Sequence, residues 1–259
     1  MNFQSYRELP GVNASSLKHM AVSPLHYQYN LRHDRPDTTA MAKGRAIHSA
    51  SLEPDELPKR YVTWPDARRG KEWIAFKAAA ESAGREILTT DEYDDVIACR
   101  DAVRSHPVAA QYLSAGRAEQ TLEWTDAETG LACKARLDWM THGGTVVDLK
   151  TARDISTRAF ERQTHDLLYY VQAAHYVAGA GAARFVFIAV ESNPPHDVRC
   201  GPLSDDALYA GEQERRRLLN LVADCTESGV WPGAFPSETE FDLPQWYYAA
   251  GERVLEGLA

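Results

Sequence analysis

The sequence predicts a mixed α/β (α+β) domain in which a central mixed sheet, including an antiparallel meander, is flanked by helices. Residues 119–150 alternate polar and apolar side chains around two turns, as a three-stranded meander does. Residues 184–191 are the most strand-like run in the chain. Residues 204–228 carry apolar side chains at helical spacing among many charges, which predicts a long amphipathic helix outside the sheet. This order of elements fits a mixed core better than a bundle or a sandwich.

The first 116 residues are expected to be mainly helical. Asn13 and Ser23 are plausible N-caps of two short, linked helices, and Thr39 is placed to cap a third that ends before Pro54. Residues 56–70 contain prolines, a glycine and a basic cluster, so we expect an exposed loop there. Further helices are expected at residues 72–82, 90–105 and 107–116.

Beyond the meander, residues 157–179 are expected to be helical with a break near Thr164. A strand at residues 198–202 should follow the one at 184–191. The tail from Trp231, which includes the aromatic residues 246–248, is rich in proline and aromatic side chains and is expected to lack regular structure.

Composition excludes several classes of protein. With 259 residues, of which 44% are hydrophobic and 25% charged, the chain can bury a sizeable core, and it has no apolar run near the ~20 residues of a membrane span. Its N-terminus lacks a secretory signal pattern, so we expect a soluble, cytoplasmic protein. The four cysteines are irregularly spaced and form no Cys-x-x-Cys pair: Cys99, Cys133, Cys200 and Cys225. This spacing indicates reduced thiols and argues against zinc ribbons and iron–sulfur clusters.

Residues 137–151 contain the most informative pattern. If the turn is centred on Gly143, antiparallel pairing places Asp138 directly opposite Asp148, with Lys150 on the same face of the sheet. Like charges in this position are destabilising, which suggests a cation between them. Two carboxylates beside a lysine are what metal-dependent hydrolysis of a phosphodiester requires. The alternative is that both aspartates are solvent-exposed strand-end acids and Lys150 is their surface partner, because short motifs are weak without structural context.

Two further pairs accompany this pattern. Gln172 and Tyr176 lie one helical turn apart and share a face, from which they could hold a phosphate or fix the lysine. His48 follows Gly44 by one turn, and the small glycine would let another chain approach closely. A lone histidine is more often a surface residue or a satisfied core residue.

Four motifs therefore follow one another: Gly44-x-x-x-His48, Ala135-Arg-Leu-Asp138, Val147-Asp-Leu-Lys-Thr151 and Gln172-x-x-x-Tyr176. In this order they resemble the motif series of the RecB-like branch of the PD-(D/E)xK nuclease superfamily. The match looks closer still to RecE-type exonucleases, the C-terminal nuclease domain of exodeoxyribonuclease VIII. Segments at residues 10–17, 52–54, 126–130 and 231–232 also look like that domain, so the resemblance covers about residues 6–248.

The resemblance implies a PD-(D/E)xK restriction-endonuclease-like core and a single exonuclease domain over residues 1–259. Its parts would be a helical N-terminal part (about 1–116), a catalytic core (about 117–228) and an irregular C-terminal tail (229–259). The family's long N-terminal extension is absent, so we expect the nuclease module alone.

The implied activity is a Mg²⁺-dependent 5′-to-3′ exodeoxyribonuclease that degrades one strand of linear duplex DNA and leaves 3′ single-stranded tails for recombination. Mn²⁺ would substitute for Mg²⁺, whereas Ca²⁺ would support binding without turnover. The expected partners are duplex DNA with free ends, a RecT-type single-strand annealing protein of a bacterium or phage-infected host, and further copies of the chain in a ring-shaped tetramer.

Carried over residue by residue, the metal ligands would be His48, Asp138, Asp148 and the Leu149 backbone carbonyl. Lys150 would be the catalytic lysine, with Gln172 and Tyr176 as supporting residues. Glu119 is a weaker candidate that we expect to be structural.

A net charge of −9 is unfavourable for a nucleic-acid-binding protein, so DNA contacts must be local, in a basic cleft or a channel built by several subunits. Candidates for phosphate contact are Lys43, Arg45, Arg68, Arg69, Lys71, Lys134, Arg136 and Arg153. Two alternatives stay open: an endonuclease or a single-strand or flap nuclease with the same metal core, and a catalytically inactive DNA-binding assembly protein.

Overall fold

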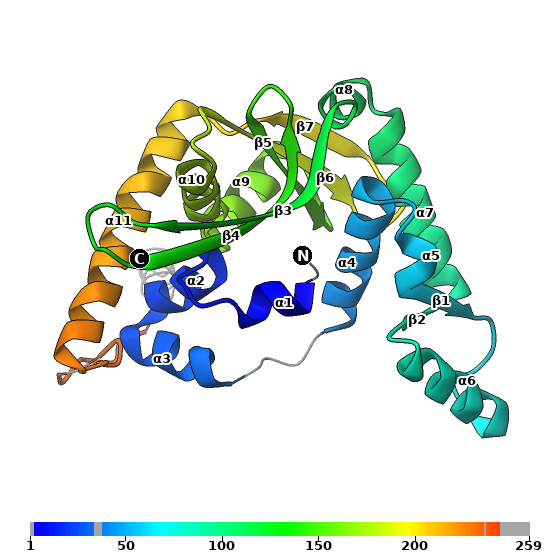
Figure 1. Ribbon diagram of the computed structural model, residues 1–259, viewed down its shortest axis with the longest axis horizontal. Helices are drawn as coiled ribbons and strands as arrows, with labels where there is room; N and C mark the ends of the chain where they lie inside the picture. Colours follow the sequence, from blue (N-terminus) through cyan, green and yellow to red (C-terminus); the bar gives the residue numbers. More distant parts are fainter. Residues whose placement is uncertain (1–2, 34–37, 236, 244–259) are drawn as a thin grey trace, which may run out of the picture.

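The computed structural model describes residues 3–33, 38–235 and 237–243 of the chain. Within these residues, five strands form a mixed sheet with helices on both faces, and a separate two-stranded sheet lies beside one of the helices (Figure 1). The predicted mixed α/β architecture is confirmed. None of the described helices combines the length and hydrophobicity needed to cross a bilayer.

The large sheet has the strand order β3-β4-β5-β6-β7. The predicted antiparallel meander is confirmed, because β4 pairs antiparallel with both of its neighbours. β6 then runs parallel to β5, and β7 antiparallel to β6. The strands are β3 (Gly116–Thr125), β4 (Ala132–Thr141), β5 (Thr145–Ala152), β6 (Arg184–Glu191) and β7 (Val198–Pro202).

Alternating side chains give the sheet two apolar faces. On one face, Val147 and Leu149 of β5 belong to the core cluster under α4 and α7. On the other, Val146 of the same strand belongs to the cluster under α9 and α10. The helices over the first face are α4 (Thr39–Leu52), α7 (Thr90–Ser105) and α8 (Pro107–Leu113).

The second face carries two layers of helix. α9 (Thr157–Asp166) and α10 (Tyr169–Ala180) link β5 to β6, and α10 is covered in turn by α11 (Asp205–Ser228) and α2 (Ala14–Val22). The expected caps Asn13 and Ser23 are confirmed for α2 and α3 (Pro24–Arg32), since each side chain accepts a backbone N–H of the first turn. This layer brings the N-terminal helix α2 next to α10, although the two are far apart in sequence.

Several local features differ from the sequence-based expectations. Residues 56–70 are not a plain loop, because they contain α5 (Leu57–Arg60) and β1 (Tyr61–Trp64), and α6 (Gly70–Ser82) starts at their end. β1 pairs in parallel with β2 (Glu86–Thr89), which no sequence pattern had marked as a strand, and Leu88 of β2 is buried in the core. Thr38 rather than Thr39 caps α4. The described N-terminus also forms α1 (Phe3–Glu8).

The expected break in the helical segment after β5 is confirmed. It lies at Leu167 and Leu168, just beyond Thr164, and Leu168 adopts a left-handed backbone with φ of 52°. The described tail residues 229–235 and 237–243 contain no helix or strand, and the aromatic residues 246–248 lie outside the described residues.

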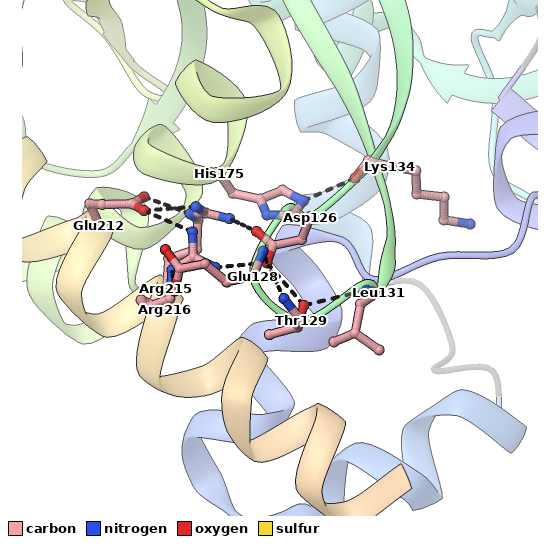
Figure 2. A network of polar contacts seen from close by, with 9 residues as sticks. All are labelled: Asp126, Glu128, Thr129, Leu131, Lys134, His175, Glu212, Arg215 and Arg216. Atoms are coloured by element: carbon pink, nitrogen blue, oxygen red, sulfur yellow. Dashed lines mark hydrogen bonds and ion pairs between the residues drawn. The ribbon is translucent and has the colours of Figure 1, made fainter. Parts of the chain in front are cut away.

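A buried ionic network holds the β3–β4 hairpin onto α11 (Figure 2). The Asp126 carboxylate accepts hydrogen bonds from the backbone N–H and hydroxyl of Thr129, which closes the hairpin turn. It also faces two guanidinium groups of α11: Arg215 Nη1 at 3.4 Å and Arg216 Nη1 at 2.7 Å. Arg215 is only 3% exposed and donates a further pair of hydrogen bonds to Glu212. Each charge in this network therefore has a partner, as buried charges require.

The network should make folding stability depend on pH. Burial alone would raise the pKa of Asp126, but the hydrogen bonds from Thr129 and the guanidinium of Arg216 outweigh it and lower the pKa to about 2. Because this folded-state pKa lies below the unfolded value of 3.8, the stabilisation is complete above about pH 5 and is lost as the pH falls toward 2.

We predict that Asp126→Asn lowers the free energy of unfolding by about 2 kcal/mol at pH 7, and that this difference falls to about half near pH 3. Urea unfolding followed by circular dichroism at several pH values measures both quantities. The control Asp55→Asn removes an exposed carboxylate and should stay within about 0.5 kcal/mol of wild type. A difference for Asp126→Asn that does not change with pH would contradict the prediction.

Candidate active site

The site begins where β4 and β5 separate. The two strands pair through Trp139 with Val147 and Met140 with Val146, which confirms the predicted register and makes Asp138 and Asp148 the next opposed positions. Beyond these pairs the Asp138 carboxylate, not a backbone carbonyl, accepts the N–H of Leu149 at 2.8 Å. The side chain of Asp138 is thereby fixed against the backbone of β5.

His48 reaches this carboxylate from α4. Its Nδ1 atom lies 3.3 Å from Asp138 Oδ2. Gly44, one turn earlier, faces β5, and a Cβ there would be in ordinary van der Waals contact with Thr151 Oγ1 at 3.5 Å, so the packing of α4 on β5 does not depend on a glycine. Burial alone would lower the pKa of His48, but the charge and hydrogen bond of Asp138 outweigh it and raise the pKa. His48 and Asp138 are therefore paired at the open end of the two strands, and the carboxylate favours the protonated imidazole.

Asp148, Lys150 and Gln172 form a second cluster beside this pair. Asp148 is 1% exposed, and its Oδ1 accepts a hydrogen bond of 2.8 Å from Gln172 Nε2. Lys150 Nζ lies 2.5 Å from Asp148 Oδ2 in an ion pair that is not aligned as a hydrogen bond. Burial, reinforced by the neighbouring charge of Asp138, raises the pKa of Asp148, although Lys150 opposes this shift.

Lys150 and Tyr176 both have a raised pKa, which keeps the lysine charged and the phenol neutral. Burial alone would lower the pKa of Lys150, but the carboxylates of Asp148 and Asp138 raise it, so the ammonium stays charged. Burial and the same two carboxylates raise the pKa of Tyr176 well above its usual value. Tyr176 is thus a neutral phenol at physiological pH.

Lys18 and Tyr169 also belong to the cluster, and sequence reasoning missed both. Lys18 of α2 points its Nζ at Gln172 Oε1, 3.5 Å away, and lies 5.0 Å from the centre of the Tyr169 ring. Burial and the nearby charge of Lys150 lower the pKa of Lys18 to about 8. No local pattern could reveal this contact, because Lys18 and Gln172 are 154 residues apart and meet only through the packing of α2 on α10.

The donor set suits a hard divalent ion. It contains the carboxylates of Asp138 and Asp148 and the imidazole of His48. The Leu149 carbonyl lies next to Asp148 on β5. Asp148 Oδ2 is buried without an aligned hydrogen-bond donor. In the part of the chain that the structure describes, however, no three His, Cys, Asp or Glu side chains converge as a ready metal site. Asp138 is turned to His48, and Asp148 to Lys150 and Gln172. Ligation through Asp148 Oδ2 would therefore place the ion beside Lys150.

Two of the basic residues expected to contact DNA are committed elsewhere, which corrects that expectation. Lys134 is 5% exposed and donates to the backbone carbonyls of Tyr6, Arg7 and Leu9, so it holds the end of α1. Arg136 is ion-paired with Glu119, which lies opposite Asp138 in the β3–β4 register. Glu119 thus has the structural role expected of it, and neither cation presents its charge to solvent.

The remaining basic candidates are at least partly exposed. Lys43, Arg45 and Arg68 form ion pairs with Asp95, Glu86 and Glu92, respectively. Arg69 and Lys71 are exposed at the start of α6, and Arg153 is exposed just after β5. A cleft of about 500 Å³ between α4 and the end of β5 is lined by both Lys43 and Arg153. Gly44, one helical turn before His48, and Thr151, the residue after Lys150, also line this cleft. The cleft therefore adjoins the site.

The chain and its fold are similar to a known family and to solved structures. Residues 13–239 match the family model described as a PDDEXK-like domain of unknown function (DUF3799). A comparison with the sequences of curated proteins finds no match. Among solved structures, a candidate exonuclease from Eubacterium rectale is similar, with a TM-score of 0.61 and 14% sequence identity over 96% of this chain and 95% of that one. A phage-related exonuclease from Haemophilus somnus 129PT has a TM-score of 0.39 and 11% identity over 86% of this chain and 98% of that one.

We predict that deleting Gly143 abolishes divalent-ion binding. A turn shorter by one residue shifts the β4–β5 register and moves Asp138 to the opposite face from Asp148 and Lys150. Isothermal titration with Mg²⁺ or Mn²⁺ measures the loss, and far-ultraviolet circular dichroism confirms that the variant folds.

Gly143→Ala is the matched control, because it keeps the length of the turn. A Cβ at this position would meet nothing nearer than Thr141 Oγ1 at 3.9 Å. This variant should bind the ion as wild type does. Equal affinities for the deletion variant and wild type would refute the link between register and metal binding.

Proposed function

Because the chain belongs to the family of PDDEXK-like domains of unknown function (DUF3799), we propose that it is a metal-dependent nuclease that hydrolyses phosphodiester bonds of DNA. The observation that carries the proposal is the cluster of Asp148, Lys150 and Gln172 beside the Asp138–His48 pair. Carboxylates and a charged lysine at one point are the groups that metal-assisted attack of water on phosphorus needs.

Each residue has a role that follows from its contacts. His48, Asp138, Asp148 and the Leu149 carbonyl would hold the ion. When bound, the ion supplies a Lewis acid that favours hydroxide over water and neutralises phosphate charge. Gln172 orients Asp148 through the hydrogen bond to Oδ1. Tyr176 lies beside Gln172 as a neutral phenol and adds no charge to the site.

Lys150 is placed to act on the reacting groups. As a permanently charged ammonium, it orients the attacking water and stabilises the negative charge that develops on the phosphate oxygens. The attacking water gives up one proton to solvent as its oxygen forms a bond to phosphorus. The bond from phosphorus to the 3′-oxygen breaks, and the leaving oxygen takes a proton from solvent. The products are a 5′-phosphate and a 3′-hydroxyl.

The finer proposal is a Mg²⁺-dependent exonuclease that degrades one strand of linear duplex DNA from its 5′ end. It would work as a single domain, in a ring of several copies, and hand its 3′ tails to an annealing protein of RecT type. This proposal draws on the order of the four motifs and on the basic residues that remain exposed near the cleft. DNA contacts are assigned to Lys43, Arg45, Arg68, Arg69, Lys71 and Arg153.

We predict that Asp148→Ala reduces Mg²⁺-dependent cleavage on the order of 1000-fold, because it removes both an ion ligand and the partner of Lys150. DNA binding should persist, since the exposed basic residues are unchanged. Cleavage is measured on a linear labelled duplex, and binding by fluorescence anisotropy. Asp224→Ala, which removes an exposed acid of α11, should cleave at the wild-type rate. Cleavage by Asp148→Ala at the wild-type rate would show that the site is assigned wrongly.

We also predict that the protein digests linear duplex DNA but not covalently closed circles. Duplexes labelled at the 5′ or the 3′ end should lose mononucleotides first from the 5′ label. Digestion of the closed circle would instead indicate an endonuclease, and release from the 3′ label would reverse the polarity. Tight binding without any cleavage would favour an inactive assembly protein.

A further inference from the structure

Two ammonium groups converge on one amide oxygen in the active site. Lys18 Nζ lies 3.5 Å and Lys150 Nζ 3.4 Å from Gln172 Oε1. Both also lie over the same aromatic ring, at 5.0 Å and 4.6 Å from the centre of Tyr169. The two lysines come from different elements, α2 and β5. Their charges are therefore brought together by the packing of the fold and not by proximity in sequence.

Only one of these charges is neutralised within the described residues. Lys150 forms an ion pair with Asp148, whereas no acidic side chain of the described part of the chain forms an ion pair with Lys18. The contacts of both lysines with Gln172 are at the long end of the hydrogen-bonding range, so the amide holds neither of them firmly. The two ammonium groups repel each other, and the charge of Asp148 offsets this repulsion at Lys18 only in part, so a further anion between them would be favourable.

The position of Lys18 is well defined by its neighbours in sequence. Leu17 and Met20 of α2 are fully buried, and they anchor the helix against α10 and α11. Lys18 therefore projects from a fixed helix toward the cluster. Its lowered pKa of about 8 still leaves the ammonium mostly protonated at pH 7.

We propose that Lys18 is a second phosphate-binding residue of the active site, which contacts the scissile phosphate of DNA together with Lys150. The inference rests on the proposed nuclease function. A phosphodiester carries two non-bridging oxygens that share one negative charge, so two separate ammonium donors can each take one of them. Lys150 then acts from the side of the sheet and Lys18 from the side of α2.

The test compares Lys18→Met, which keeps the aliphatic stem, with Lys18→Arg, which keeps the charge. Single-turnover cleavage of a linear duplex in Mg²⁺ should fall about 100-fold in Lys18→Met. DNA binding is measured separately in Ca²⁺ by fluorescence anisotropy over a range of salt concentrations. Loss of one phosphate contact should reduce the slope of log affinity against log salt by about one in Lys18→Met, and Lys18→Arg should keep the wild-type slope.

Lys59→Met is the matched control. Lys59 lies on α5, is 65% exposed and pairs with Glu56 rather than with any residue of the cluster. Its substitution by methionine removes the same charge and should change neither the cleavage rate nor the salt slope. Thermal unfolding checks that each variant is folded, and Lys18→Gln is measured in the same way if Lys18→Met does not fold.

The outcomes separate this inference from the proposed function. A wild-type protein that cleaves no DNA overturns the proposed function, and the inference with it. An active wild type with an unchanged Lys18→Met variant overturns the inference alone. A slow Lys18→Met variant with the wild-type salt slope also overturns it, because Lys18 would then act only by positioning Gln172. A slow variant with a reduced slope, restored by arginine, supports it.

Discussion

The hydrogen bond from the Leu149 N–H to the Asp138 carboxylate is the contact on which the site depends. It replaces a backbone bond at the point where β4 and β5 separate, so the strands can open without leaving a donor unpaired. The opening admits His48 from one face of the sheet. On the other face, strict alternation along β5 directs Asp148 and Lys150 toward α10. One strand register thus fixes two carboxylates, one imidazole and one ammonium relative to each other.

Much of this arrangement could be predicted from the sequence, because it depends on local rules. The Gly143–Gly144 turn and the alternating pattern around it determine the register, and helical spacing puts Gln172 and Tyr176 on one face. What the sequence could not reveal depends on distant partners. β1 and β2 are too short to be recognised before their pairing is known, and Lys134 looks like a surface cation until α1 is seen to end on it. Lys18 was missed for the same reason.

Two groups of buried charges differ in how completely they are paired. Around Asp126, every carboxylate oxygen and guanidinium has a partner, which suits a clamp that holds a hairpin to a helix. Around Asp148, one carboxylate oxygen lacks an aligned donor and two ammonium groups compete for a single amide oxygen. Natural proteins tolerate such incomplete pairing mainly where a ligand completes it. The contrast separates the clamp at Asp126 from the cluster that we propose receives an anion and a cation.

The clamp between Asp126 and α11 also has a consequence for synthesis of the chain. Arg216 follows Asp126 by 90 residues, so the hairpin that carries Asp138 is translated long before the helix that secures it. α10 is likewise packed between the sheet and α11, with the Gly211 backbone so close to Tyr170 that an added Cβ would lie 2.2 Å from its carbonyl oxygen. A ribosome-bound chain that ends before α11 therefore lacks the layer that presses Gln172 and Lys18 together. Because α11 follows every other described helix in the chain, we expect the cluster to pack fully only after α11 has been synthesised.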